Sequence, residues 1–321
     1  MNKLTVTVSP HIHSGASTRR IMLDVIIALL PALAAAVFFF GYRVLILTSA
    51  TVSAAVLAEM ASRMIMKRDT DTIYDLSAVI TGLLLALSLP VSLPIWQAAL
   101  GSAIAIVVIK QFFGGLGQNF VNPAIAGRLV LMFSFPVAMS AVWNAPRGYA
   151  GDAVTTATQA DAITTATPLG LLAEGAALPS YWELFIGAHA GSMGETSILA
   201  LLIGAAYLLW RRVISPVIPL TFIGTTLLIV TLAGQDPLVH LMTGSLVIVA
   251  FFMATDYVTC PMNLKGRIVF GIGCGIITAL IRLFAALPEG VSFAVLLMNI
   301  LVPHIETLTL PKAFGQKGGK G

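Results

Sequence analysis

The sequence predicts an all-α protein that crosses a membrane many times, and three observations indicate this class. The chain of 321 residues is 58% hydrophobic and 10% charged, with a mean hydropathy of +0.94, whereas soluble domains carry about 25% charged residues. Apolar runs long enough for a helix to cross the hydrocarbon core recur along the chain. Short polar connections, in which Lys and Arg gather, separate these runs.

Ten segments fit membrane-spanning helices. In chain order they are 21–41, 44–65, 75–93, 95–113, 126–142, 196–211, 213–233, 238–255, 267–287 and 290–307. The first has no small-residue cleavage site at its end, so it is expected to be a retained helix and not a signal peptide. Two segments are expected to be shorter or interrupted: the third carries Thr81-Gly82 and ends at Pro90, and the tenth carries Asn299 and Pro303.

Basic residues indicate the orientation of these helices. The pairs Arg19-Arg20, Lys67-Arg68 and Arg211-Arg212 and the lysines of the tail all fall on one side if both termini are cytoplasmic. Three arginines, at positions 43, 147 and 282, are exceptions. We therefore expect a multi-pass protein of the inner (cytoplasmic) membrane with segment 143–195 outside. The net charge of +4 comes from scattered residues, so no nucleic-acid partner is expected.

The long polar segment divides the helices into five and five. The expected organisation is a cytoplasmic N-terminal segment (1–20), a first transmembrane repeat (21–142), an extracytoplasmic loop (143–195), a second repeat (196–307) and a cytoplasmic tail (308–321). An odd number of helices gives the two halves opposite orientations, as in inverted repeats. Ile80-Thr81-Gly82-Leu83 also resembles Met242-Thr243-Gly244-Ser245 in the corresponding helix of the second half.

A hydroxyl-rich motif lies in the extracytoplasmic loop. The run Asp161-Ala-Ile-Thr-Thr-Ala-Thr-Pro-Leu-Gly170 fits the pattern D-x-x-[ST]-x-A-T, in which a flavin phosphate is joined to the last threonine through a phosphoester. That threonine is Thr167, preceded by Thr165 and Ala166, and Pro168 biases it toward an extended conformation. A near copy ends at Thr158, which makes Thr158 a second candidate. The alternative interpretation of both copies is a polar Ala/Thr linker.

A second constellation begins at Lys110 and ends at Ala124. Three glycines, at positions 114, 115 and 117, suit a backbone that turns tightly or approaches a planar ligand. Asn119 and Asn122 offer amide groups to an isoalloxazine edge, and Lys110 could extend to the interface or meet a phosphate. The alternative is a glycine-rich turn between helices with an asparagine as helix cap.

Other candidates are few. Ionisable residues in or near the spans are functional candidates by default, although side chains close to an interface can extend to the headgroups. They are Asp24, Glu59, Lys110, His240, Asp256, Arg282 and Glu306. Cys260 and Cys274 form no CxxC pair, and no HExxH, P-loop or paired-histidine spacing occurs. We therefore predict no catalytic side chain and no metal site.

Taken together, these motifs resemble a known family. They are Ser9-Pro10-His11, Arg20–Asp24, Tyr74–Ala78 with Thr81-Gly82, Gly114–Ala124, Asp161–Leu169, and Ala254-Thr255-Asp256 with Lys265-Gly266-Arg267. The chain resembles the family of the D subunit of Rnf ion-translocating ferredoxin:NAD oxidoreductases and, more distantly, the B subunit of sodium-pumping NADH:quinone reductases. The short segment before the first helix favours the Rnf type, because the quinone-reductase subunit usually carries a longer extension.

The resemblance implies a set of cofactors and partners. It implies FMN bound covalently to Thr167 and a second, noncovalent flavin, riboflavin, held among the helices of two inverted five-helix repeats similar to urea transporters. It further implies an electron-carrying subunit that is inactive alone. Its partners would be other membrane and peripheral subunits, including a second covalent-flavin subunit, and a flavin transferase during maturation. Thr165 departs from the family pattern, which often has Ser or Gly there. The rival hypotheses are a urea-transporter-like channel or transporter and a membrane scaffold, both without cofactors.

Overall fold

The computed structural model describes residues 17–68, 74–141, 143–144, 146, 167–173, 175–285 and 290–310. Every regular element in this part of the chain is a helix. Four helices are long and apolar enough to cross a membrane, by length and composition. They are α1 (Thr18–Phe40), α2 (Arg43–Ile65), α12 (Leu264–Phe284) and α13 (Val291–Thr309). Together with several shorter apolar helices, they confirm the predicted class, an all-α polytopic membrane protein.

The remaining elements are shorter. The first half contains α3 (Ser77–Leu87), α4 (Ile95–Ile104) continued by the π-helix η2 (Ala105–Gln111), α5 (Pro123–Ser134) and the π-helix η3 (Val137–Ala141). Two short helices follow, α6 (Pro168–Ala173) and α7 (Tyr181–Ile186). The second half contains α8 (Ile198–Trp210), α9 (Val217–Leu232), α10 (Pro237–Met242), α11 (Leu246–Ile248) and the π-helix η5 (Val249–Met253).

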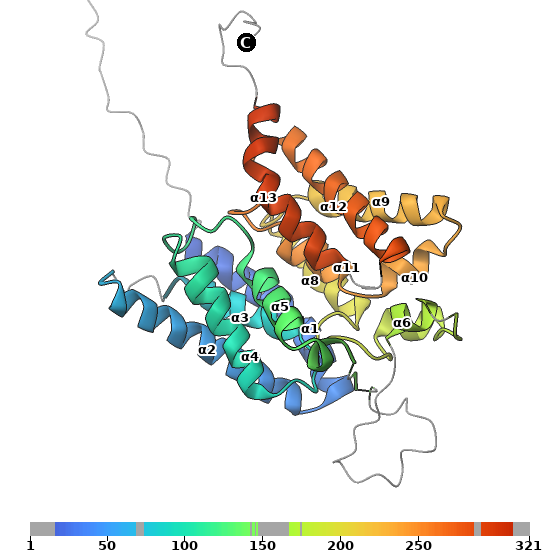
Figure 1. The fold of residues 1–321 in the computed structure, drawn as a ribbon, viewed down its shortest axis with the longest axis horizontal. Coiled ribbons are helices and arrows are strands. Elements are labelled where there is room, and N and C mark those ends of the chain that lie inside the picture. Colours follow the sequence, from blue (N-terminus) through green and yellow to red (C-terminus); the bar gives the residue numbers. More distant parts are fainter. Residues whose placement is uncertain are drawn as a thin grey trace, which may run out of the picture.

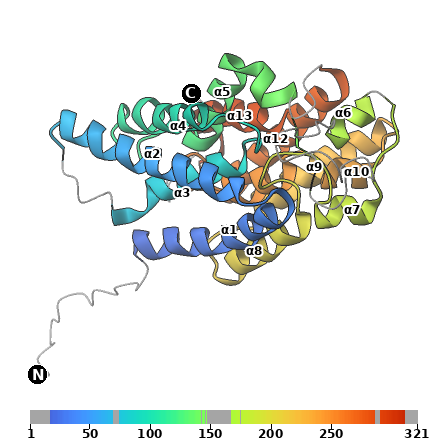
Figure 2. The ribbon, with the colours of Figure 1, turned by 90° about the horizontal axis from the view of Figure 1, so that it is seen from below.

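The two halves pack in corresponding ways. In Figure 1, α2–α5 (blue to green) lie on one side and α9–α13 (yellow to red) on the other. Within the halves, α2 packs on α4 as α9 packs on α12, and α4 contacts α5 as α12 contacts α13. Between the halves, α1 contacts α8 and α5 contacts α13, and the second view shows α1 and α8 side by side (Figure 2). The first helix of one half therefore contacts the first helix of the other, and the fifth contacts the fifth. This is the pairing expected if two five-helix repeats face each other.

The third expected span is short, since α3 has 11 residues, but neither it nor the tenth is interrupted. Helix α3 continues through Thr81-Gly82, because Gly82 allows close approach to α2; a Cβ there would lie 2.8 Å from the Cα of Val52. Helix α13 continues through Pro303, because packing against α12 and α5 supports it despite the loss of one internal hydrogen bond.

The predicted continuous helix 238–255 was also wrong. It breaks after Met242, and Gly244 adopts a left-handed conformation with φ +67° before α11 begins. Arg282 of α12 satisfies the exposed carbonyls, donating from Nη1 to His240 O at 2.6 Å and from Nη2 to Thr243 O at 3.1 Å. We call α10–α11–η5 the broken segment. Its two ends lie at two parts of the candidate site described below.

A buried loop completes the end of α3. After α7, the N–H of Met193 donates to Leu89 O at 3.0 Å and that of Gly194 to Leu87 O at 2.7 Å. Residue 194 must be small, because a Cβ there would lie 2.5 Å from Leu87 Cβ. The loop thus takes the place of the missing next helical turn.

Candidate functional site

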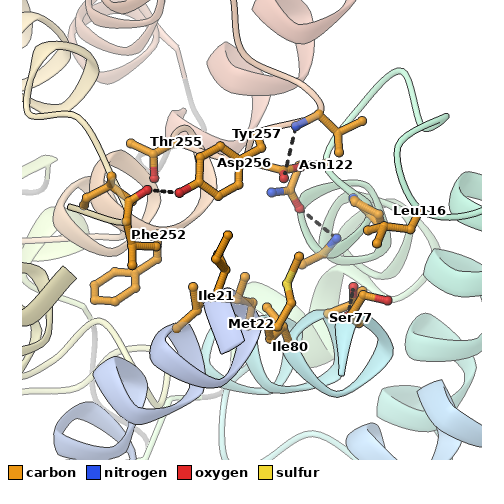
Figure 3. A pocket seen from close by; sticks show the side chains of 18 of the residues that line it. Ile21, Met22, Ser77, Ile80, Leu116, Asn122, Phe252, Thr255, Asp256 and Tyr257 are labelled. Carbon is orange, nitrogen blue, oxygen red and sulfur yellow. Dashed lines mark hydrogen bonds between the residues drawn. The ribbon is translucent and has the colours of Figure 1, made fainter. Parts of the chain in front are cut away.

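A cavity lies between the two halves of the bundle, and we call it the central cavity. Its volume is about 100 Å³, measured as space open to the centres of water molecules; one water needs roughly 10–15 Å³ by that measure. Its walls come from α1, α3, η2, the turn after η2, the α8–α9 turn and the end of η5. In Figure 3, Asn122 and Asp256 lie on one side of this space, and Ile21, Met22 and Ile80 lie opposite.

Three predicted site residues, Lys110, Asn119 and Asn122, line this cavity together. The turn that carries the asparagines contains the three glycines, all with positive φ (+127°, +104° and +89°). Asn119 donates from Nδ2 to Val121 O at 3.1 Å. The glycines therefore hold the asparagine amides at the cavity wall.

Asn122 has two structural roles. Its Oδ1 accepts from the N–H groups of Ala124 and Ile125, at 3.0 and 3.4 Å, so it caps α5, as the alternative interpretation held. Its Nδ2 donates to Met253 O at 3.1 Å, at the end of η5. This one side chain therefore ties the first half to the broken segment of the second.

Lys110 is held by an ion pair. Its Nζ lies 2.9 and 3.1 Å from the two carboxylate oxygens of Glu59 and 2.6 Å from Ser77 Oγ, so all three ammonium donors are used. Gln111 donates to the same carboxylate at 2.7 Å, and Glu59 is fully buried. Extension to the interface is therefore wrong for Lys110: its stem lines the cavity while its charge is satisfied by Glu59.

The side of the cavity that holds Asn122 also carries Thr255 and Asp256, directly after η5. The Asp256 carboxylate accepts from Val258 N at 3.4 Å and from Thr259 Oγ1 at 3.2 Å. Asn299 of α13 reaches the same region, since its reoriented amide donates to Thr259 O at 3.0 Å and accepts from Asn122 N at 3.1 Å. Polar groups of both halves thus meet at one edge.

Thr167 lies elsewhere, at the start of α6. Its Oγ1 accepts from Gly170 N at 3.2 Å and its carbonyl oxygen from Leu171 N at 2.9 Å, so it caps this helix and is partly buried. Thr165, Ala166 and Thr158 lie outside the described residues. Thr167 is not among the residues that line the central cavity.

The broken segment connects these two places. Leu169 of α6 is buried, and both its Cδ1 and Arg282 Nη2 lie close to Gly244, at 2.8 and 3.0 Å from the position a Cβ would take there. Figures 1 and 2 both show α6 beside α10. From Gly244 to Thr255 the chain is mostly helical and spans roughly 15 Å at about 1.5 Å per residue. One end of it meets the Thr167 helix and the other meets the central cavity.

Sequence reasoning missed the partners of these residues. Glu59 and Lys110 were each recognised as charges within spans, but their pairing across α2 and η2 was not. Asp24 was likewise seen alone, whereas it accepts from Tyr207 Oη at 2.8 Å and from Arg211 Nη2 at 3.1 Å, which ties α1 to α8. The available signal was the presence of opposite charges at similar depths in neighbouring spans.

The fold and the cavity define a class: a polytopic helical membrane protein whose interrupted helices border a polar site between two halves. The chain belongs to the NQR2, RnfD, RnfE family, whose model matches residues 5–315.

Named relatives cover nearly the whole chain. It is 45% identical to the D subunit of the Na+-translocating ferredoxin:NAD+ oxidoreductase complex of Acetobacterium woodii, over 98% of this chain and 97% of that protein. It is 41% identical to the D subunit of the proton-translocating ferredoxin:NAD+ oxidoreductase complex of Clostridium ljungdahlii, over 98% and 97%. It is 36% identical to the D subunit of the ion-translocating oxidoreductase complex of Escherichia coli, over 97% and 98%. These relatives support a redox subunit over a urea-transporter-like channel.

Proposed function

We propose that this chain is a flavin-carrying membrane subunit of an ion-translocating ferredoxin:NAD oxidoreductase complex. Family membership and the names of relatives that match it end to end support the complex. The observation that supports the flavin role is the central cavity, where the predicted ligand residues of the Lys110–Ala124 segment lie together with Thr255 and Asp256 of the second half. The partners would be other membrane and peripheral subunits, including a second covalent-flavin subunit.

The central cavity suits a noncovalent flavin such as riboflavin. Apolar Ile21, Met22 and Ile80 offer a surface for one ring face, and polar groups lie across from them. Asn119 spends its Nδ2 on Val121 O, which leaves its amide oxygen as the acceptor for a ring N–H. A bound flavin supplies one- and two-electron transfer, and the protein supplies position and polarity.

Lys110 and Glu59 would act on this site indirectly. Their ion pair uses every ammonium donor, so it fixes the Lys110 stem as a wall and keeps the ammonium on Glu59. Asn122 holds Met253 and so keeps the Asp256 edge in register with the asparagine edge. These residues orient the ligand and exclude water.

Thr167 is the proposed attachment point for FMN, joined by a flavin transferase. The motif supports this assignment, and the hydroxyl lies at the start of a short helix that Leu169 seats on the Gly244 break. Residues of α6 would thus place the cofactor at one end of the broken segment, with the central cavity at the other. Ion movement would be coupled through that segment. One relative is named as translocating Na+ and another as translocating protons, so similarity does not identify the ion that this chain's complex would move.

In-gel flavin fluorescence after denaturing electrophoresis tests the attachment. We expect a fluorescent band from the wild type, co-expressed with a flavin transferase, and its loss in Thr167→Ala. Thr158→Ala is the matched control, because it removes the last threonine of the near copy. Loss in Thr158→Ala alone would move the site, and a dark wild-type band despite active transferase would remove covalent flavin from the account.

A further inference from the structure

A second cavity, here called the arginine cavity, lies where the α8–α9 turn meets the start of α12. Its volume is about 230 Å³ by the same measure. Its lining includes Arg212, Ser215, Ile218, Tyr257, Cys260 and Arg267. It shares Val213, Ile214, Thr255 and Tyr257 with the central cavity, so these residues form a common wall.

The charge on its lining is uncompensated. Arg212 and Arg267 come from different elements, and the lining has no acidic side chain. Within the described part of the chain, neither guanidinium forms an ion pair with a carboxylate, and Arg267 uses Nε on Pro261 O at 3.1 Å. The neighbouring Arg211, by contrast, is paired with Asp24.

Nearby acids are engaged elsewhere. Asp256 accepts from Val258 N and Thr259 Oγ1, and Glu306 accepts from Met262 N at 3.1 Å. The two arginines therefore face an open space without an ion-pair partner among the described residues, an arrangement that a folded protein tolerates most easily when an anion binds there.

The backbone at Arg212 is a second, independent observation. Arg212 follows the end of α8 with φ +55°, the left-handed region that favours glycine at this position of a helix end. Hydrogen bonds from Arg212 N to Leu209 O and from Val213 N to Leu208 O close the turn, at 3.0 and 2.9 Å, and a glycine would make both. An arginine at a glycine position points to a role for its side chain.

The remaining wall suits the same ligand. Ser215 precedes α9, and Ile218 lies in the first turn of this 16-residue helix, at the positive end of the helix dipole. Each of the two helices that border this cavity has an exposed apolar side chain close in sequence to a lining residue. Leu220 on α9 is two residues from Ile218, and Leu264 on α12 is three residues from Arg267. Cationic groups thus lie next to surface that faces acyl chains in a bilayer.

We propose that the arginine cavity binds a phosphate group, supplied by the phosphodiester of an anionic phospholipid. Guanidinium groups bind phosphate oxygens through paired, charge-assisted hydrogen bonds. Basic pockets between transmembrane helices on the cytoplasmic side hold lipid headgroups in this way. The arginines lie on the face that the distribution of basic residues assigns to the cytoplasm.

The test uses the purified complex in phosphatidylcholine nanodiscs titrated with phosphatidylglycerol, and bound phosphatidylglycerol is counted by mass spectrometry. The variant is Arg212→Gly with Arg267→Ala; the glycine keeps the helix end favourable, so the fold should survive. The control is Lys265→Ala, which removes one exposed positive charge from the same turn of α12 but not from the cavity. We expect about tenfold weaker binding for each arginine removed and no change in the control, with Arg267→Lys in between.

A second arm separates the two sources of phosphate. Equilibrium dialysis with inorganic phosphate, on complex in phosphatidylcholine alone, measures soluble phosphate binding. Loss of that binding in the double variant, with phosphatidylglycerol binding unchanged, would overturn the lipid assignment. If both bindings match the Lys265→Ala control in a complex of unchanged thermal stability, the cavity is no phosphate site.

Discussion

Replacing Glu59 with glutamine would leave Lys110 as a buried cation without its counter-charge. The Lys110 side chain is 3% exposed, and its Nζ lies 2.9 and 3.1 Å from the carboxylate that the change neutralises. Arg63 Nε, 3.8 Å from the same carboxylate, would add to the repulsion. Removal of one partner of a buried pair typically destabilises a fold by about 3–5 kcal/mol. The folded population relative to the unfolded should therefore fall at least a hundredfold.

The assay is a double-mutant cycle on the thermal or SDS-induced unfolding of the purified protein. Glu59→Gln and Lys110→Met should each destabilise strongly, while the double variant should recover most of the loss, because an apolar side chain replaces the stranded charge. Glu183→Gln is the control, since glutamine can keep the helix-capping box that Glu183 forms with Ser180 and should change stability little. Additive losses in the double variant would refute the argument that the pair acts as a unit.

Three further predictions concern the loop, the attachment helix and pH. Gly194→Ala should cost about 1–3 kcal/mol through overpacking against Leu87, whereas Gly224→Ala, with nothing within 4 Å, should cost nothing measurable in the same thermal scan. A spin label can be attached at Thr167→Cys in a background of Cys260→Ser and Cys274→Ser. Leu169→Ala should increase the mobility of this label, whereas Leu172→Ala should not. Equal spectra for the two variants would contradict the packing of Leu169 against Gly244. The hydrogen bond from Tyr181 lowers the pKa of Asp236. This contact between α7 and α10 therefore stabilises the fold at neutral pH and is lost as the pH falls through that lowered pKa; Trp182 fluorescence should report an acid transition that Tyr181→Phe removes, and an unchanged transition would contradict it.

The sequence was a good guide to where helices lie, because burial in a membrane requires long apolar runs. The first span was expected at 21–41, and α1 is Thr18–Phe40. Helix breaks were not predictable from the same signal. The dipeptide Thr-Gly occurs in both halves, yet Gly82 stays helical because α2 needs close approach, and Gly244 takes positive φ where Arg282 satisfies the carbonyls. Those outcomes depend on partners far away in the chain.

The candidate site was predictable where it depends on local sequence, and not where it depends on partners far away in the chain. The glycines and asparagines of one segment predict a turn that places Asn119 and Asn122 together, and both line one cavity. Lys110 lines the same cavity, but its ion-pair partner, Glu59, lies 51 residues away in the chain. Asp256 is one of the ionisable candidates in or near the spans, and only the packing of the second half against the first brings it to the cavity.

The measurement that tests the central claim most directly is the flavin content of the purified chain, divided into covalent and extractable fractions. Both kinds of flavin are expected in the wild type. Thr167→Ala should lose only the covalent fraction, and Ile80→Trp, which fills the central cavity, should lose only the extractable one. If Ile80→Trp keeps its extractable flavin in a correctly folded protein, or if the wild type has none, the central cavity is not the flavin site.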